Sequence, residues 1–170
     1  MTEHDISKAL VCPGSSSRYL WSSLKVLAVR NFKGITTHEE DLLVIHPSGA
    51  VWVVEVKVSI ADLKAEFRDK KAKHTEMLEG RRAVRFYGGF SHQPTKVERF
   101  FIAIPRELLE KAEPLIPDWC GIIVVWFDDT KHSYAKVHRR GKKLPGQRAT
   151  AEDRQKVYES IYYRHWGAKA

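Results

Sequence analysis

The sequence predicts an α/β fold in which helices flank a mixed central β-sheet within a single domain. Three observations lead to this prediction. Val-rich runs of strand length alternate along the chain with segments of helical spacing. A length of 170 residues suits one domain. A hydrophobic content of 43% is enough to build a core, and it excludes a disordered chain.

Two helices are expected in the first half of the chain. Leucines at helical spacing predict the first over Arg18–Asn31, opened by a serine cap at residues 15–17. The second is predicted over Ile60–Glu79, a segment without Gly or Pro that ends at Gly80. His74 lies on the apolar stripe of this helix, and we expect it to be a hydrogen-bonded, half-buried histidine rather than a metal ligand.

A hairpin is predicted between these helices. Its strands are Asp41–Ile45 and Val51–Val58, and a turn at Pro47, Ser48 and Gly49 connects them. Proline suits the first position of a three-residue loop, and glycine accepts the left-handed backbone that the third position requires.

The second half of the chain is predicted to add strands and short helices. Gly121–Phe127 is an almost continuous apolar run, typical of a central strand covered on both faces, and Trp126 within it is assigned to the core. Further strands are expected at Val84–Tyr87, Val97–Ile104 and Ser133–Arg139, and the last of these is expected at a sheet edge. Helices are expected at Arg106–Ala112 and Thr150–His165, and a loop at Gly88–Gly89.

The net charge of +8 is concentrated at one end of the sequence. Residues 131–170 hold eleven Lys and Arg against three Asp and Glu, whereas residues 1–130 hold eighteen of each. Such a basic segment favours a polyanionic partner, because each phosphate contact releases condensed counterions. We expect DNA, and RNA is an alternative that fits the same charge. The side chains expected to contact phosphate are Lys136, Arg139, Arg140, Lys142, Lys143 and Arg148.

Other classes of protein are disfavoured. No apolar run reaches the ~18 residues of a membrane helix, and the first residues do not form a signal peptide, so we expect a cytoplasmic protein without a membrane partner. Cys12 and Cys120 lack neighbours at zinc-ligand spacing, which argues against a zinc site or a disulfide framework. The sequence leaves a homodimer open.

The hairpin register brings two carboxylates and a lysine together. With a three-residue loop, Asp41 lies directly opposite Glu55, and Lys57 shares that face because side chains alternate along a strand. A four-residue loop would instead pair Asp41 with Val56. Facing carboxylates repel, and a divalent cation such as Mg²⁺, which binds carboxylate and phosphate oxygens, would relieve the repulsion. A lysine beside the metal can orient or activate water, or stabilise charge on phosphate, so these residues predict a phosphodiester hydrolase.

The same residues resemble a known family. Asp41, followed after thirteen residues by Glu55-Val56-Lys57 on the next strand, resembles the motif of the PD-(D/E)XK nuclease superfamily. More narrowly, residues 55–63, 69–71 and 100–105 resemble the MmcB-like DNA repair-associated group. The resemblance covers residues 18–127 approximately. It implies one domain over residues 1–170, with a restriction-endonuclease-like αβββαβ core and residues 131–170 as a basic extension.

The resemblance also implies an activity. It points to a Mg²⁺- or Mn²⁺-dependent DNA endonuclease in DNA repair, recombination, or the processing of phage or mobile-element DNA. The residues that it implies for the site are Asp41, Glu55 and the Val56 carbonyl as metal ligands, and Lys57 and Lys71 as catalytic lysines.

Two alternatives stay open at this point. Some members of the family carry a carboxylate in the first helix, but the segment 18–31 has none, so Glu39 or Glu40 would have to replace it. This departure favours a nuclease-like fold that binds DNA without cutting it. A protein that processes or binds RNA is compatible with the same charge.

Overall fold

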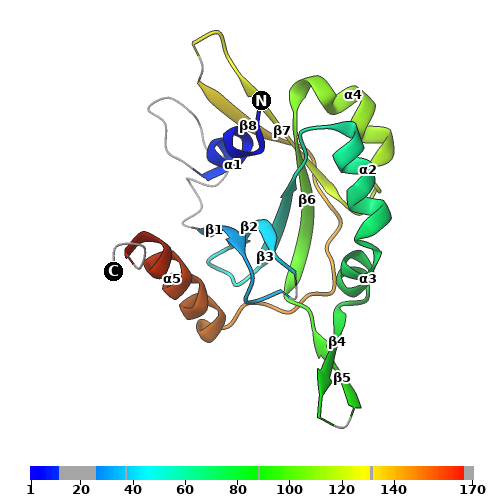
Figure 1. Cartoon of the computed structure of the whole chain (residues 1–170), viewed down its shortest axis with the longest axis vertical. Coiled ribbons are helices and arrows are strands. Elements are labelled where there is room, and N and C mark those ends of the chain that lie inside the picture. The colour runs from blue at the N-terminus through cyan, green and yellow to red at the C-terminus, as the bar shows by residue number, and fades with distance from the viewer. Residues whose placement is uncertain (12–25, 37, 88, 131, 167–170) are drawn as a thin grey trace.

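A six-stranded mixed sheet forms the centre of the protein (Figure 1). The computed structural model describes the chain apart from residues 12–25, 37, 88, 131 and 167–170. Along the sheet the strands are β1 (Leu27–Phe32), β2 (Glu40–Ile45), β3 (Val51–Val56), β6 (Val97–Pro105), β7 (Gly121–Phe127) and β8 (Ser133–Arg139). β3, β6 and β7 are parallel to one another, and the other neighbours are antiparallel. The predicted α/β class with a mixed sheet is confirmed.

Helices cover both faces of this sheet (Figure 1). On one face lie α2 (Ile60–Asp69), α3 (Lys71–Glu79) and α4 (Leu109–Ala112), and on the other lies α1 (Glu3–Val11). Two short 3-10 turns, η2 (Arg106–Leu108) and η3 (Glu113–Leu115), flank α4, and α5 (Ala151–Trp166) packs beside the edge strand β1. Each face has its own apolar core, as expected for strands buried on both sides. No helix within the described ranges is long and apolar enough to cross a membrane.

The first predicted helix is wrong where the structure describes it. Leu27–Phe32 forms strand β1, which pairs with β2, and residues 12–25 lie outside the described residues. The segment's leucines have helical spacing, but the free edge of β2 offers a row of unpaired backbone groups that β1 satisfies. Tertiary pairing therefore overrides the local pattern, and the helix before the hairpin is α1, which the sequence pattern did not predict.

The second predicted helix is two helices. Lys70 breaks the segment between α2 and α3 with φ −101° and ψ 32°. The buried residues are Leu63 and Glu66 in α2 and Lys73, His74 and Met77 in α3, whereas Leu78 of the predicted apolar stripe is 45% exposed. After Gly80, β4 (Arg81–Phe86) and β5 (Gly89–Pro94) form a separate two-stranded hairpin where a short strand and a loop were expected.

The two ends of the parallel strands have different surroundings. The carboxyl ends of β3, β6 and β7 lead into α2, η2 and the β7–β8 connection. Residues 140–150 instead cross the amino ends, where Leu144 N donates to Glu98 O at 2.8 Å and Ala149 N donates to Gly49 O at 2.8 Å. This division decides which basic residues can reach the candidate site.

Candidate functional site

The β2–β3 hairpin has the predicted turn and register. The His46 N–H donates to the Ala50 carbonyl at 2.9 Å, and Gly49 adopts a left-handed φ of +88°. The paired residues run from Ile45–Val51 to Leu42–Val54, which excludes the four-residue loop. Continued by one residue, this register would set Asp41 opposite Glu55. Side chains alternate as expected near the turn, where the apolar residues on the face of Glu55 are Leu43, Ile45, Val51 and Val53.

Asp41 lies where the paired part of the hairpin ends. Its Oδ2 accepts a hydrogen bond of 2.8 Å from the Val56 N–H, a group that would donate to a β2 carbonyl in a regular antiparallel ladder. Burial, and then the negative charge of Glu55, raise the pKa of Asp41 to about 6. The Asp41 carboxylate is thus destabilised by its surroundings and would be stabilised by an added cation.

Glu55 is buried among lysine ammonium groups. Its Oε1 accepts from Lys73 Nζ at 2.6 Å, and its Oε2 accepts from Lys70 Nζ at 3.0 Å and from Lys57 Nζ at 3.3 Å. Burial alone would raise the pKa of Glu55, but the charges of Lys73 and Lys57 and the hydrogen bond from Lys73 together outweigh burial, and the pKa lies below its usual value. The predicted pair of Glu55 with Lys57 is present, and two further lysines that the sequence did not predict join it.

Glu40 and Lys73 extend the cluster into the interior. Both are buried, and Lys73 Nζ lies 2.5 Å from Glu40 Oε2. Burial raises the pKa of Glu40, whereas the two carboxylates next to Lys73 overcome the effect of burial and raise the pKa of its ammonium group. Of the two residues considered as a replacement for a first-helix carboxylate, Glu40 belongs to the cluster and Glu39 is exposed.

Glu66 of α2 binds the remaining cations. Its Oε2 lies 2.9 Å from Lys57 Nζ and 2.8 Å from Lys70 Nζ, and its Oε1 lies 3.1 Å from His74 Nε2. Burial opposes ionisation of Glu66, but hydrogen bonds from His74, Lys70 and Lys57 hold its pKa well below the usual value. His74 is a buried, hydrogen-bonded histidine, as predicted.

The structure corrects the expectation for Lys71. This residue begins α3 and is exposed, whereas Lys70 and Lys73 on either side of it reach Glu55. The apolar stripe assigned Lys71 to the sheet-facing side. The buried side instead carries the charged residues Glu66 and Lys73, which a stripe of apolar residues does not mark.

Sequence reasoning missed Glu66, Lys70 and Lys73. A usable signal existed for Glu66, which follows the buried Leu63 by one helical turn. No comparable local signal existed for Lys73, because its charged group is buried against Glu40, thirty-three residues earlier in the chain.

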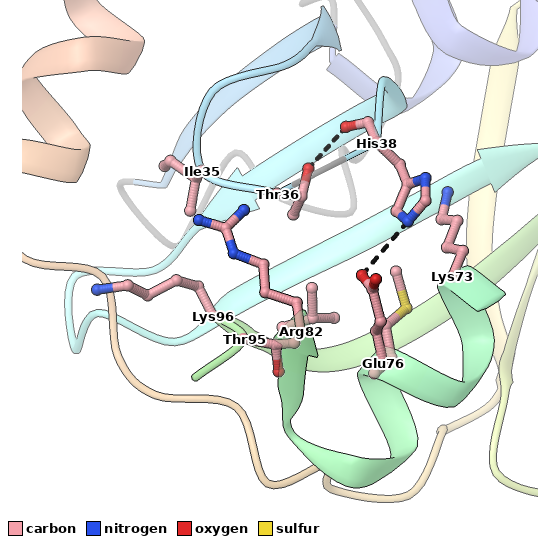
Figure 2. Close-up of a pocket in the computed structure, with 10 residues that line it drawn as sticks. Ile35, Thr36, His38, Lys73, Glu76, Arg82, Thr95 and Lys96 are labelled. Carbon is pink, nitrogen blue, oxygen red and sulfur yellow. Dashed lines mark hydrogen bonds and ion pairs between the residues drawn. The ribbon is translucent and has the colours of Figure 1, made fainter. Parts of the chain in front are cut away.

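A small cavity lies behind Lys73, between α3, the loop before β2 and the start of β6 (Figure 2). Its volume is about 20 Å³, far below the several hundred Å³ of sites that bind small molecules. His38 Nε2 lies 3.4 Å from Glu76 Oε2 at one end, and Arg82 and Lys96 line the other. The cavity is too small for a substrate, so we place the candidate chemistry at the cluster around Glu55.

Most of the predicted phosphate-binding residues lie away from this cluster. Arg139 donates to the carbonyls of Ile116, Pro117 and Cys120, so its guanidinium group is engaged within the fold. The exposed residues on the segment that crosses the amino ends of the parallel strands are Arg140, Lys142, Lys143 and Arg148, and Lys142 is paired with Asp118. These four residues therefore lie at the edge of the sheet opposite the carboxylates, whereas Lys136 and Arg139 are on β8, and their role in phosphate binding stays a prediction.

The cluster has the donor chemistry of a hard-metal site but is occupied by ammonium groups. Its buried carboxylates are Glu40, Glu55 and Glu66, its cations are Lys57, Lys70 and Lys73, and Asp41 lies near enough for the charges of Glu55 and Lys57 to affect its pKa. Carboxylate oxygens suit Mg²⁺ or Mn²⁺. In the part of the chain that the structure describes, no three His, Cys, Asp or Glu residues are arranged to hold a metal ion. Glu40 Oε1 is buried without a hydrogen-bond partner, so one oxygen of the set remains available.

Comparisons with known proteins extend the description of the fold only. No family model matches the chain, and no curated protein matches it. A solved structure, the SPO1766 protein of unknown function from Silicibacter pomeroyi, is similar with a TM-score of 0.50 and 17% sequence identity. The similarity covers 85% of this chain and 83% of that chain. At this identity it supports the shared architecture and carries no information about activity.

Proposed function

We propose that this protein is a metal-dependent phosphodiesterase that cuts DNA, as the resemblance to the PD-(D/E)XK superfamily implies. The observation that carries the proposal is that Asp41, Glu55 and Lys57 meet where the β2–β3 pairing ends: the charge of Glu55 acts on Asp41, and Lys57 Nζ lies 3.3 Å from Glu55 Oε2. Burial and the neighbouring Glu55 raise the pKa of Asp41, so the Asp41 carboxylate is the group of the pair whose negative charge an added cation would relieve. A sheet end with two carboxylates and a lysine suits chemistry on phosphate esters.

Asp41, Glu55 and the Val56 carbonyl would hold Mg²⁺ or Mn²⁺. The bound ion would supply Lewis-acid activation of the phosphate and of the attacking water. The Val56 N–H already orients the Asp41 carboxylate through its hydrogen bond. Glu55 would exchange an ammonium partner for the metal, and Lys70, whose side chain is 43% exposed, is the partner that can withdraw into solvent.

Lys57 acts in this proposal as a cation and not as a base. Burial alone would lower its pKa, but Glu55 and Glu66 outweigh burial and raise the pKa above its usual value. A protonated lysine cannot accept a proton from water, but it can stabilise the negative charge that develops on the phosphate. Of the two roles that the sequence allowed for Lys57, the electrostatic role fits its surroundings better.

A second candidate is a nuclease-like protein that binds DNA without cutting it. The observation that favours it is the contact of Glu55 with three lysines, which neutralises the carboxylate as a buried ion-pair network would. In that case the cluster serves stability, and added metal has no site to occupy.

A cleavage assay distinguishes the two candidates. Purified protein is incubated with single-stranded, duplex and branched DNA in Mg²⁺, Mn²⁺ or EDTA. We expect cleavage only with metal, and Glu55→Gln or Lys57→Ala should lower the rate by about 100-fold or more. Lys64→Ala, which removes an exposed lysine of α2, is the matched control. Folded wild-type protein that cuts none of these substrates would support the binding protein instead.

A further inference from the structure

A groove between β7, β8 and the η2–α4 segment combines aromatic and basic side chains. It is lined by Arg106, Leu109, Val124, Trp126, Lys136 and His138, and its volume is about 450 Å³. A second hollow, which shares Arg106 and Trp126, adjoins it beside Met1 and Phe127. These volumes lie within the range of sites that hold small molecules, and they far exceed that of the cavity behind Lys73.

Trp126 is the centre of this groove. It is half-buried and was assigned to the core from the sequence, but its ring also lines both hollows. It stacks on Tyr134 with a centroid distance of 5.5 Å and an interplanar angle of 13°, and the Arg106 guanidinium lies 5.6 Å from its ring centre. Aromatic rings beside an arginine offer unpaired bases a surface for stacking and a cation for cation–π contacts.

The charges around Trp126 suit a phosphate backbone on one side. Lys136 and His138 of β8 line the groove opposite Arg106, and no carboxylate is among the described lining residues. His138 Nε2 lies 3.2 Å from Glu113 Oε1, and Glu107 and Glu110 line the second hollow. The backbone of a bound strand would therefore follow Lys136 and avoid the acidic hollow.

The topology brings this groove to the same edge of the sheet as the carboxylate cluster. Lys57 directly follows β3, Arg106 directly follows β6, and Trp126 is near the end of β7. These three strands are parallel neighbours, so their carboxyl ends share one edge, with about 10 Å from β3 to β7. In Figure 1 the three strands end at the side of the molecule where α2 begins and the N-terminus lies.

We propose that the groove around Trp126 binds single-stranded DNA and leads the strand to the cluster around Glu55. The proposal rests on the proposed nuclease function for the identity of the ligand. The sequence prediction assigned DNA binding to six basic residues, of which Lys136 lines this groove, whereas Arg140, Lys142, Lys143 and Arg148 lie at the opposite edge. Bases in a duplex are already stacked on one another, so an aromatic platform selects unpaired segments.

Binding of a labelled oligothymidylate, measured by fluorescence anisotropy in EDTA, tests the groove without requiring cleavage. We expect Lys136→Glu and Arg106→Ala to weaken binding about tenfold each, and Trp126→Leu to do the same while retaining apolar packing. Lys64→Glu makes the same charge change as Lys136→Glu on exposed α2 and should have a much smaller effect. Melting temperatures of all variants identify any loss of folding, and Arg106→Ala and Lys136→Glu keep the test valid if Trp126→Leu unfolds.

Each outcome bears on one proposal or the other. If the groove variants bind the oligothymidylate more weakly, the proposal that the groove binds single-stranded DNA is supported. If the wild-type protein also never cuts DNA, only the nuclease proposal fails. Equal effects of Lys136→Glu and Lys64→Glu, or unchanged binding in Arg106→Ala and Trp126→Leu, would overturn the groove. Tighter binding of a duplex, or of oligouridylate, than of oligothymidylate would overturn its assignment to single-stranded DNA.

Discussion

Replacing Lys73 tests whether the buried cluster is an ion-pair network. Lys73 Nζ lies 2.5 Å from Glu40 Oε2 and 2.6 Å from Glu55 Oε1, and all three side chains are at most 1% exposed. Lys73→Met keeps the length of the side chain and removes its charge. Glu55 would retain Lys57 and Lys70, but Glu40 would lose its only ion-pair partner among the described residues.

The expected cost follows from the uncompensated Glu40 carboxylate. Breaking a buried pair by removing one partner costs about 3–5 kcal/mol, a large part of the 5–15 kcal/mol of a typical domain. With a urea slope of about 2 kcal/mol/M, the unfolding midpoint of Lys73→Met should fall by about 2 M. Removing both charges should cost much less, so Glu40→Gln combined with Lys73→Met should recover about 2 kcal/mol of that loss.

The pH dependence of Lys73→Met gives an independent check. Burial already raises the pKa of Glu40, and loss of the ammonium group raises it further. The folded state then binds a proton that the unfolded state releases above about pH 4.5, so stability falls as pH rises above that value. Urea unfolding at about pH 5 and about pH 8 should show the larger loss at the higher pH. A loss below about 1 kcal/mol at both pH values, or no recovery in the double variant, would refute the ion-pair interpretation.

Three further predictions concern other parts of the molecule. Mn²⁺ should raise the melting temperature at about pH 7, and it should do so less at about pH 5, where Asp41 is protonated. The variants Asp41→Asn and Glu55→Gln should not show this rise. An equal rise in these variants would mean that the metal binds elsewhere. The pKa of Asp41 is raised to about 6, so its ionisation lowers the stability of the folded state as pH rises from about 4 to about 6. Over this range, urea unfolding should show Asp41→Asn gaining stability relative to the wild-type protein. A constant difference in stability would contradict the raised pKa. Gly146→Ala should lower the free energy of unfolding by about 1–3 kcal/mol in the same assay, because the added Cβ would lie 2.1 Å from the Val97 carbonyl oxygen. An unchanged unfolding midpoint would show that residues 140–150 can shift to make room.

The hairpin that carries the candidate site could be predicted closely from the sequence. Pro47 and Gly49 set the length of the turn, and the turn length sets the register. The opposition of Asp41 and Glu55, and the presence of Lys57 on their face, follow from that register alone. These are local consequences of a short connection, so no distant contact was needed to infer them.

The first helix and the lysines of the cluster could not be predicted in this way. Residues 27–32 have helical spacing but form β1, because the edge of β2 provides hydrogen bonds that a helix there would leave unmade. Lys73 rather than Lys71 reaches Glu55 because Lys73 lies on the buried side of α3, where Glu40 and Glu55 both pair with it. Both outcomes depend on partners distant in sequence, which local periodicity does not report.

The net charge shows the same division between sequence and structure. Composition alone located the excess of positive charge in residues 131–170 and indicated a polyanionic partner. Only the folded chain shows that residues 140–150 cross the amino ends of the parallel strands, whereas Lys57, Arg106 and Trp126 lie at their carboxyl ends. The sequence by itself determined the hairpin, the α/β class and the carboxylate pair, because turn chemistry and alternation act over a few residues. The tertiary structure decided which charges share an edge of the sheet, because that depends on strand order and direction, which are set by long-range packing.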